Sequence, residues 1–167
     1  AYGNGDFATA FKERKPIAEQ GNIFAQFNLG VMYQYGYGVI QDYKEAARRY
    51  RIAAKQGNVT AQYNLGVAYD NGDGVPQDYK EAIQWYRLAA EQGDAHAQLN
   101  LGVMYGSDKS FFQNFIYAHM WLNIAASNGI EEARDGLKMI AANMTTSDIL
   151  EAQRLARECV KKNYKGC

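Results

Sequence analysis

Residues 21–56 read GNIFAQFNLGVMYQYGYGVIQDYKEAARRYRIAAKQ, and residues 57–92 repeat this stretch as GNVTAQYNLGVAYDNGDGVPQDYKEAIQWYRLAAEQ. A third copy begins at Gly93-Asp94 and a fourth at Gly129-Ile130, so the period is 36 residues. Periods of about 20 to 50 residues are typical of arrays in which each unit packs on its neighbours. The sequence therefore predicts a solenoid of stacked units.

Each copy predicts two helices separated by a glycine-rich turn. The first helix begins after Asn22, a residue type that caps helix N-termini, and its apolar residues recur at i, i+4, i+7 and i+8. These residues are Ala25, Leu29, Met32 and Tyr33. Gly36-Tyr37-Gly38 then interrupts the apolar pattern, so the first helix is expected to end there.

The start and the end of the second helix are also marked in the sequence. Asp42 and Glu45 have the spacing of a capping box, and the same spacing returns 36 residues later. Gly57 and Gly93 are expected to end the second helix in the left-handed conformation that glycine adopts readily.

Two residue types are unfavourable in the middle of the first helix. Glycine there costs about 1 kcal/mol relative to alanine, so we predict that the partner helix approaches closely at each glycine, along a row of alanines. The glycines are Gly30, Gly66 and Gly102, and the alanines are Ala46, Ala82 and Ala118. The asparagine two residues before each glycine is predicted to be architectural. These are Asn28, Asn64 and Asn100.

The array opens and closes on incomplete units. Asp6-Phe7 lies 36 residues before Asp42-Tyr43, and the last unit ends in a helix that begins at the capping sequence Thr145–Asp148 and has a polar outer face. We therefore expect an all-α fold of about nine helices in a single solenoid. Its parts are a half-repeat (1–20), three repeats (21–56, 57–92 and 93–128) and a degenerate capping repeat (129–167).

The pattern Ala25-x-x-x-Leu29-Gly30-x-x-Tyr33, followed by Gly36-x-Gly38 and Tyr50-x-x-Ala53-Ala54-x-x-Gly57, resembles the SEL-one-like repeat (SLR), a relative of the tetratricopeptide repeat. The resemblance implies a right-handed α-solenoid of helix-turn-helix repeats, in which the first helices line a concave surface that receives other proteins. It also implies a bacterial protein of the periplasm or one that is secreted, with a cytoplasmic location as the alternative.

Composition excludes several kinds of partner. Lys plus Arg and Asp plus Glu both number 18, so there is no basic field to collect phosphates, and nucleic acid is not an expected partner. Each long apolar run is broken by polar residues before it could span a bilayer, so membrane insertion is not expected either. We expect a monomer whose partner is a protein or a peptide.

The sequence contains no recognisable catalytic or metal-binding motif. His96 and His119 lie on different predicted helices without a second ligand at metal-binding spacing, so no metal and no cofactor are expected. His119 is expected at the edge of the packing, and His96 is expected to be an exposed helix residue, with a contact in a groove as its alternative. The acidic run Asp70–Gly74 lacks the carboxylate spacing of a calcium loop and predicts a turn. We therefore expect no enzymatic activity.

The two cysteines, Cys159 and Cys167, are eight residues apart, and Gly166 would allow the tail to fold back. If the protein is exported, a disulfide that anchors the C-terminal tail is expected. The alternative is one packed and one free thiol.

The turn of the third copy differs from the others, because Asp108–Phe112 replaces both turn glycines. Phe111 and Phe112 are expected to fill space beside the terminal unit. The alternative is that they form an exposed docking point.

A second stripe on the first helices predicts the binding surface. Its positions fall at i, i+3, i+7 and i+11 from Phe24, on a face distinct from the Ala25 stripe. With the polar residues beside it, the predicted surface consists of Phe24, Phe27, Val31, Tyr35, Tyr63, Val67, Asp70, Asn71, His96, Leu99 and Val103. The favoured anchors are Phe27, Tyr63 and Leu99. The alternative is that these apolar residues pack against neighbouring helices.

The predicted function is that of an adaptor or scaffold that binds a protein or peptide in the groove of a short solenoid. One alternative is a cell-wall-related protein that binds or hydrolyses β-lactams, as implied by cysteine-rich bacterial relatives. The present chain lacks their disulfide in every repeat. The other alternative is a dedicated inhibitor or immunity protein that uses the same groove.

Overall fold

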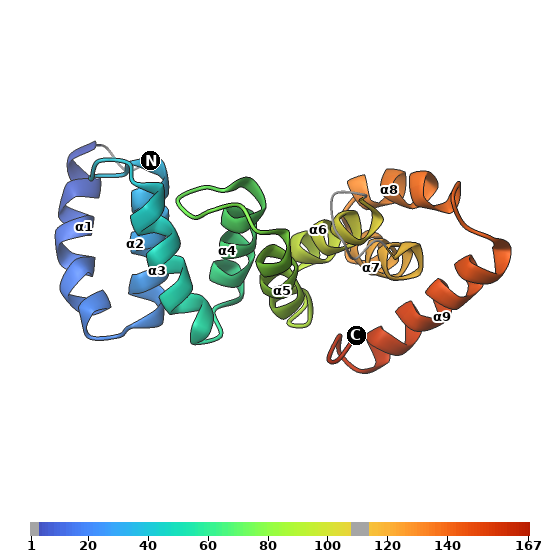
Figure 1. Cartoon of the computed structure of the whole chain (residues 1–167). Coiled ribbons are helices and arrows are strands. Elements are labelled where there is room, and N and C mark those ends of the chain that lie inside the picture. The colour runs from blue at the N-terminus through green and yellow to red at the C-terminus, as the bar shows by residue number, and fades with distance from the viewer. Residues whose placement is uncertain (1–3, 108–113) are drawn as a thin grey trace. The chain divides into compact units, whose positions relative to one another are not determined.

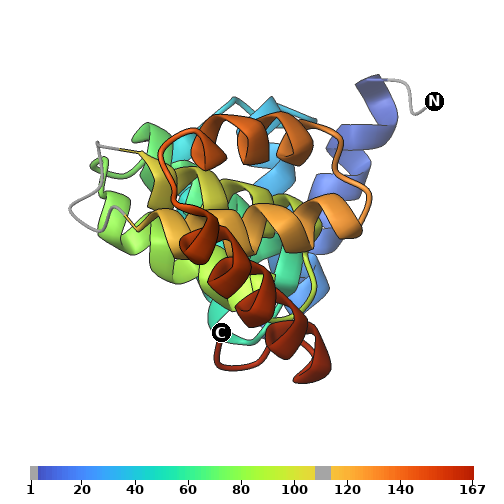
Figure 2. The same cartoon turned by 90° about the vertical axis from the view of Figure 1, so that its right-hand side faces the viewer.

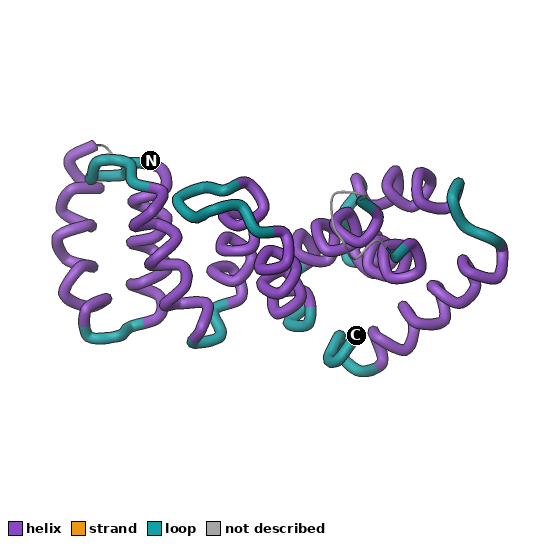
Figure 3. The backbone as a smooth tube through the Cα atoms, viewed as in Figure 1, coloured by secondary structure: helices purple, strands orange, loops and turns teal. Residues whose placement is uncertain are grey.

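The computed structural model describes residues 4–107 and 114–167. Within these ranges the chain forms nine helices and no strand, which confirms the predicted all-α solenoid (Figures 1 and 3). The helices are α1 (Asn4–Glu19), α2 (Ile23–Tyr35), α3 (Tyr43–Lys55), α4 (Val59–Asn71), α5 (Tyr79–Ala90), α6 (Ala95–Gly106), α7 (Phe115–Ser127), α8 (Glu132–Ala141) and α9 (Thr146–Lys161). The predictions for the loop Asp108–Phe112 lie outside the described residues.

The chain divides into two compact units, Ala1–Ala82 and Ile83–Cys167, and the boundary falls within α5. In the first unit, each helix from α1 to α4 packs against the next along the chain, as Figure 1 shows. In the second unit, α7 packs against α6, α8 and α9. Figure 2 shows α8 and α9 on different sides of α7.

The first helix of each repeat begins as the sequence predicts. Asn22 Oδ1 accepts a hydrogen bond of 2.9 Å from the Ala25 N–H, and the caps of α4 and α6 repeat this contact. The second helices α3 and α5 end at Lys55 and Ala90, shortly before Gly57 and Gly93, whose φ values of 89° and 91° lie in the predicted left-handed region. The helices of consecutive repeats therefore begin at equivalent positions of the 36-residue period and end at equivalent positions to within one residue.

The predicted capping box at Asp42 is only half formed. Asp42 Oδ1 accepts from the Glu45 N–H at 3.0 Å, but the Glu45 carboxylate binds Arg48 and Arg49. The Glu45 carboxylate does not accept from the Asp42 N–H, because this N–H already donates to the Tyr33 carbonyl oxygen at 2.9 Å. A complete capping box instead starts α9, between the residues Thr145 and Asp148.

The glycines inside the first helices do allow close helix approach, but the side chains facing them are not the predicted alanines. A Cβ added at Gly30 would lie 2.6 Å from the ring of Tyr50, and one added at Gly102 would lie 2.7 Å from Cγ of Leu122. Tyr50 and Leu122 occupy the same repeat position, one turn after the alanines at 46 and 118. Large side chains therefore fill the space that the glycines leave.

His119 contradicts the prediction that it lies at the edge of the packing. His119 lies on α7, and only 5% of it is exposed. Ala47 and Ile83, which occupy the same repeat position on α3 and α5, are buried too. Burial lowers the pKa of His119 because the charged imidazolium loses its hydration. His119 is therefore a neutral core residue at physiological pH.

Buried glutamines connect consecutive helices in a way that the sequence analysis missed. The Nε2 groups of Gln26, Gln62 and Gln98 each donate to the carbonyl oxygen of the residue eight positions earlier, at 2.6, 3.1 and 3.2 Å. All three side chains are buried. The 36-residue recurrence of glutamine at a position that faces the core was the available signal, because a buried amide needs hydrogen-bond partners.

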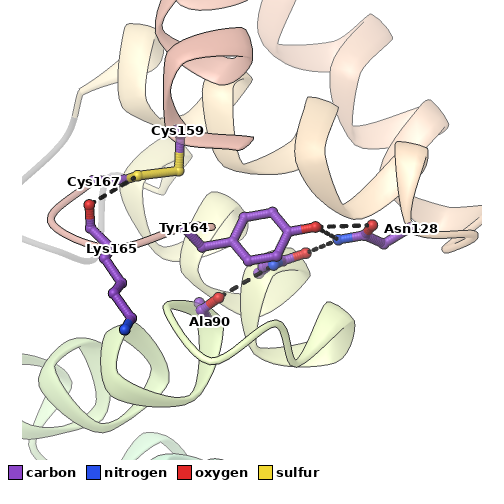
Figure 4. Close-up of a disulfide and its surroundings, with 7 residues drawn as sticks. Ala90, Asn128, Cys159, Tyr164, Lys165 and Cys167 are labelled. Atoms are coloured by element: carbon purple, nitrogen blue, oxygen red, sulfur yellow. Dashed lines mark hydrogen bonds between the residues drawn. A yellow bond between two sulfur atoms is a disulfide. The ribbon is translucent and has the colours of Figure 1, made fainter. Parts of the chain in front are cut away.

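The C-terminal tail folds back onto the second unit. The structure pairs Cys159 with Cys167 in a disulfide, with the two Cα atoms 5.6 Å apart (Figure 4). Within the closed segment, Tyr164 points at the end of α7, where its hydroxyl contacts the side chain of Asn128. Asn128 in turn donates to Oε1 of Gln98 at 2.8 Å.

Candidate binding surface

The predicted surface residues of α2 separate into exposed and half-buried groups. Phe24 and Tyr35, at the two ends of the helix, are 71% and 57% exposed. Val31 lies between them on the same face and is half-buried. Phe27 lies at the margin of this face and packs against Tyr50, with the ring centroids 6.0 Å apart. Phe24 and Tyr35 are therefore the aromatic side chains that α2 leaves accessible.

On α4, the predicted residues Tyr63, Val67 and Asp70 are half-buried, while Asn71 is exposed at the end of the helix. The Asn71 Nδ2 donates to a carboxylate oxygen of Asp73 at 3.1 Å, so the amide is held at the turn. Val67 lines a small hollow beside Tyr50. This helix presents more polar groups and less apolar surface than α2.

On α6, in the second unit, His96 and Val103 are exposed, the latter by 54%. Leu99 packs against the buried cluster formed by Leu122, Ala125 and Ala133. Two of the favoured anchors, Phe27 and Leu99, thus contact core residues, as the packing alternative expects.

An aromatic stack beside α2 was not anticipated. The rings of Phe7 and Tyr37 stack with centroids 4.8 Å apart, and Tyr35 also stacks with Tyr37, at 5.4 Å. Tyr37 is 41% exposed. Sequence patterns gave no signal for this contact, because Tyr37 lies in the Gly36–Gly38 turn, outside any helical periodicity.

The aromatic stack borders a cavity of about 270 Å³ between α1 and α2, which we call the α1–α2 cavity. Most of its wall consists of apolar and aromatic side chains, and its polar groups include the amide of Asn28 and the guanidinium group of Arg14. Its lining residues are Phe7, Ala10, Arg14, Asn28, Val31, Met32 and Tyr37. Val31 therefore belongs both to the predicted surface and to this cavity.

The same place in the next repeat is almost filled. A hollow of about 20 Å³ lies 36 residues later in the sequence. It is lined by Tyr43, Ala46, Tyr50, Asn64, Val67, Ala68 and Asp73, each at the repeat position of one residue of the α1–α2 cavity, together with Gln34. The two hollows are therefore equivalent sites of consecutive repeats.

Tyr50 explains much of the difference in volume. At its position α1 carries Arg14, which does not place a ring in the site. The Tyr50 hydroxyl donates to Oε1 of Gln34 at 2.5 Å and also forms a hydrogen bond with the Asn64 side chain. Burial raises the pKa of Tyr50, because the phenolate would lose its hydration, so the phenol stays neutral.

A comparison with models of protein families identifies the repeat. The family model described as the Sel1 repeat matches residues 23–58, 59–94 and 95–130. The chain belongs to the Sel1 repeat family. Each matched Sel1 repeat begins at the first residue of α2, α4 or α6, two residues after the glycine used above to define the period.

This Sel1 repeat protein is similar to two bacterial proteins of known structure. One is a protective antigen present in uropathogenic Escherichia coli strains that displays an SLR fold; the identity is 31%, the TM-score 0.83, and the match covers 93% of this chain and 33% of the antigen. The other is a Sel1 repeat protein from Oxalobacter formigenes, with 31% identity, a TM-score of 0.75, and 90% and 62% of the two chains covered.

The Sel1 repeat protein thus spans about one third of the first of these structures and less than two thirds of the second. A comparison with the curated proteins gave no match. In the described part of the chain, no helix is long and apolar enough to cross a membrane. Nor do His, Cys, Asp and Glu side chains there form a group of three or more that could hold a metal ion.

Proposed function

We propose that this Sel1 repeat protein is a non-catalytic scaffold that binds a protein or peptide through the exposed face of its first helices. In the first unit the contact face is that of Phe24, Val31 and Tyr35. In the same unit, Asp70 and Asn71 on α4 offer polar contacts. In the second unit, taken by itself, His96 and Val103 are the exposed residues of α6.

The observation that carries the proposal is the exposure of two large aromatic rings on one face of α2. Phe24 and Tyr35 are 71% and 57% exposed. Aromatic residues are enriched among the residues that dominate binding energy, because they offer a large apolar area for few rotatable bonds. Sel1 repeats form scaffolds that are generally used for protein-protein interaction, which supports the same function.

We also propose that the protein works in an oxidising compartment, in the periplasm or outside the cell. The disulfide between Cys159 and Cys167 supports this location, because reducing compartments keep most cysteines as thiols. The likeness to an Escherichia coli antigen is consistent with a bacterial protein of this kind.

The experiment compares partner capture by the native chain and by a Phe24→Ser, Tyr35→Ser double variant. Each protein is immobilised, incubated with extract from the source compartment and analysed by mass spectrometry. We expect both proteins to have the same circular dichroism spectrum and closely similar melting temperatures, because both rings are mostly exposed and the stacking of Tyr35 on Tyr37 lies at the surface. The double variant should lose the specific partner, with an affinity reduced at least ten-fold.

Ile40→Ser is the matched control, since Ile40 is 89% exposed in the same unit but lies away from the first-helix face. Its capture should equal that of the native chain. A double variant that folds normally and retains its partner at native affinity would show that this face is not the binding surface.

A further inference from the structure

The α1–α2 cavity has a property that its equivalent in the next repeat lacks, namely free volume. About 270 Å³ is open beside Arg14, against about 20 Å³ beside Tyr50. A water molecule takes up about 30 Å³ in the liquid, so the open cavity has room for a side chain, whereas the closed one does not. The cavity is smaller than most sites for whole drug-sized ligands.

Tyr50 shows what kind of group this site holds. Its ring lies against Gly30, and its hydroxyl meets the Asn64 side chain. In the α1–α2 cavity the equivalent of Asn64 is Asn28, which lines the open space. The cavity therefore offers an amide at the position where a phenol hydroxyl is bound one repeat later.

Arg14 adds a positive charge to the cavity wall, and this charge favours a particular type of residue next to a bound ring. It is half-buried at the wall of the cavity, and no acidic side chain of the described residues is paired with it. Its neighbours in the cavity wall are apolar or neutral. A guanidinium group in this setting favours a carboxylate, with which it forms short charge-assisted hydrogen bonds.

The aromatic stack supplies the entrance. Tyr37 contributes to the wall of the cavity and stacks with both Phe7 and the exposed Tyr35. Aromatic rings prefer offset-stacked or edge-to-face neighbours. An incoming ring therefore finds the aromatic side chains of Phe7 and Tyr37 in the cavity wall.

From these features we propose that the α1–α2 cavity receives a tyrosine side chain of a partner peptide, and that an acidic residue next to this tyrosine pairs with Arg14. The proposal rests on the proposed binding function and names the chemistry of the partner. The incoming phenol brings its hydroxyl to Asn28, as the Tyr50 hydroxyl meets Asn64 in the following repeat.

Methionine methyl NMR can test the proposal, because only Met32 among the five methionines lines the cavity. The probes are the blocked peptides Ser-Glu-Tyr-Glu-Ser, Ser-Glu-Ala-Glu-Ser and Ser-Lys-Tyr-Lys-Ser, titrated into the full chain. We expect the Glu-Tyr-Glu peptide to shift the Met32 methyl signal in a saturable way. The alanine peptide should cause no shift, and the lysine peptide should bind at least ten-fold more weakly.

Arg14→Tyr is the decisive variant. It supplies the ring that the next repeat carries at this position, so the chain fills its own cavity and should fold normally while the peptide response at Met32 disappears. Lys15→Tyr, one residue along α1 at an exposed position, is the matched control and should respond like the native chain.

Three results would overturn the proposal: a Met32 signal that stays in place at millimolar peptide, equal responses to the tyrosine and alanine peptides, or a response that persists in Arg14→Tyr. A Met139 signal that moves as much as Met32 would also overturn it, because Met139 is 73% exposed in the other unit. If the cavity fails while the Phe24, Tyr35 double variant still loses its partner, the scaffold function stands without the tyrosine site.

Discussion

The hydroxyl oxygen of Tyr164 lies 3.3 Å from both polar atoms of the Asn128 side chain, so the C-terminal tail is tied to the end of α7 (Figure 4). The ring of Tyr164 also lies against Gly93, where an added Cβ would come within 3.6 Å of it. Asn128 continues the contact to Gln98, which binds the carbonyl oxygen of Ala90. The disulfide between Cys159 and Cys167 thus holds a tyrosine that joins several turns of the second unit.

Cys167→Ser should release this tail without unfolding the unit. Cys159 is buried and remains packed at the end of α9, and closing a loop this short stabilises a chain by about 2–3 kcal/mol at most. We expect a small fall in melting temperature and much faster hydrogen exchange at Tyr164, whose N–H donates to the Cys159 carbonyl oxygen. Native protein isolated without reductant should show no free thiol by mass spectrometry. Two free thiols would contradict the pairing.

Asn64→Ala should lower the free energy of unfolding by about 1 kcal/mol, because it removes a partner of the buried Tyr50 hydroxyl. Asn28→Ala is the matched control: it occupies the same repeat position, but Arg14 replaces the tyrosine there. Its effect should be clearly smaller. Urea unfolding of the three proteins measures the difference, and equal losses would show that the asparagines act through something other than the phenol.

Stability should fall with acidification because of His119. Its folded pKa lies below the ordinary value of 6.5, so the unfolded chain takes up a proton first as the pH falls. The stability contributed by the neutral imidazole is complete above about pH 6.5 and is lost as the pH falls through the folded pKa. Protonation is costly because the side chain is buried and its Nδ1 has no hydrogen-bond partner among the described residues.

The variant His119→Ile separates this effect from general acid unfolding, because Ile83 is the natural residue at the same repeat position. Urea midpoints measured from pH 7.5 to 4.5 should decline less for the variant than for the native chain. Parallel declines would show that other groups are responsible for the acid sensitivity.

The repeat is the part of this molecule that could be predicted from sequence. Helix order and the ends of the helices follow from signals that act locally, such as the cap at Asn22 before a first helix and the left-handed Gly57 after a second helix. Local signals could not decide between competing partners. Glu45 fits a capping box in sequence, but two nearby arginines offer it stronger charge-assisted hydrogen bonds.

The candidate site was less predictable, because its features depend on volume and on contacts between distant residues. The replacement of Tyr50 by Arg14 at the same repeat position can be read from the sequence, but the cavity it leaves cannot. Likewise, the helical spacing of Phe27 and Leu99 does not reveal that core side chains lie beside them. Periodicity identifies a face of a helix, whereas exposure depends on what packs there.

The contact between Gly102 and Leu122 gives a direct test of the helix packing. Gly102→Ala would gain helix propensity, yet its Cβ would lie 2.7 Å from Cγ of Leu122, and overpacking of this kind costs about 1–3 kcal/mol. Leu122→Ala should cost about 2–5 kcal/mol, because the leucine is fully buried. In the double variant the new methyl group occupies part of the vacated space. The loss of stability measured for the double variant should therefore be smaller than the sum of the losses of the two single variants.

The coupling energy from this double-mutant cycle should be at least about 0.5 kcal/mol, as is typical for residues in contact. Urea unfolding of the four proteins supplies it. Gly106→Ala with Leu122→Ala is a suitable control pair, because the Cβ added at Gly106 would meet Ile140 instead. That pair should be closer to additive. An additive result for the Gly102 pair would show that the helices adjust to the extra methyl group without Leu122, and that the glycine is not required for their close approach.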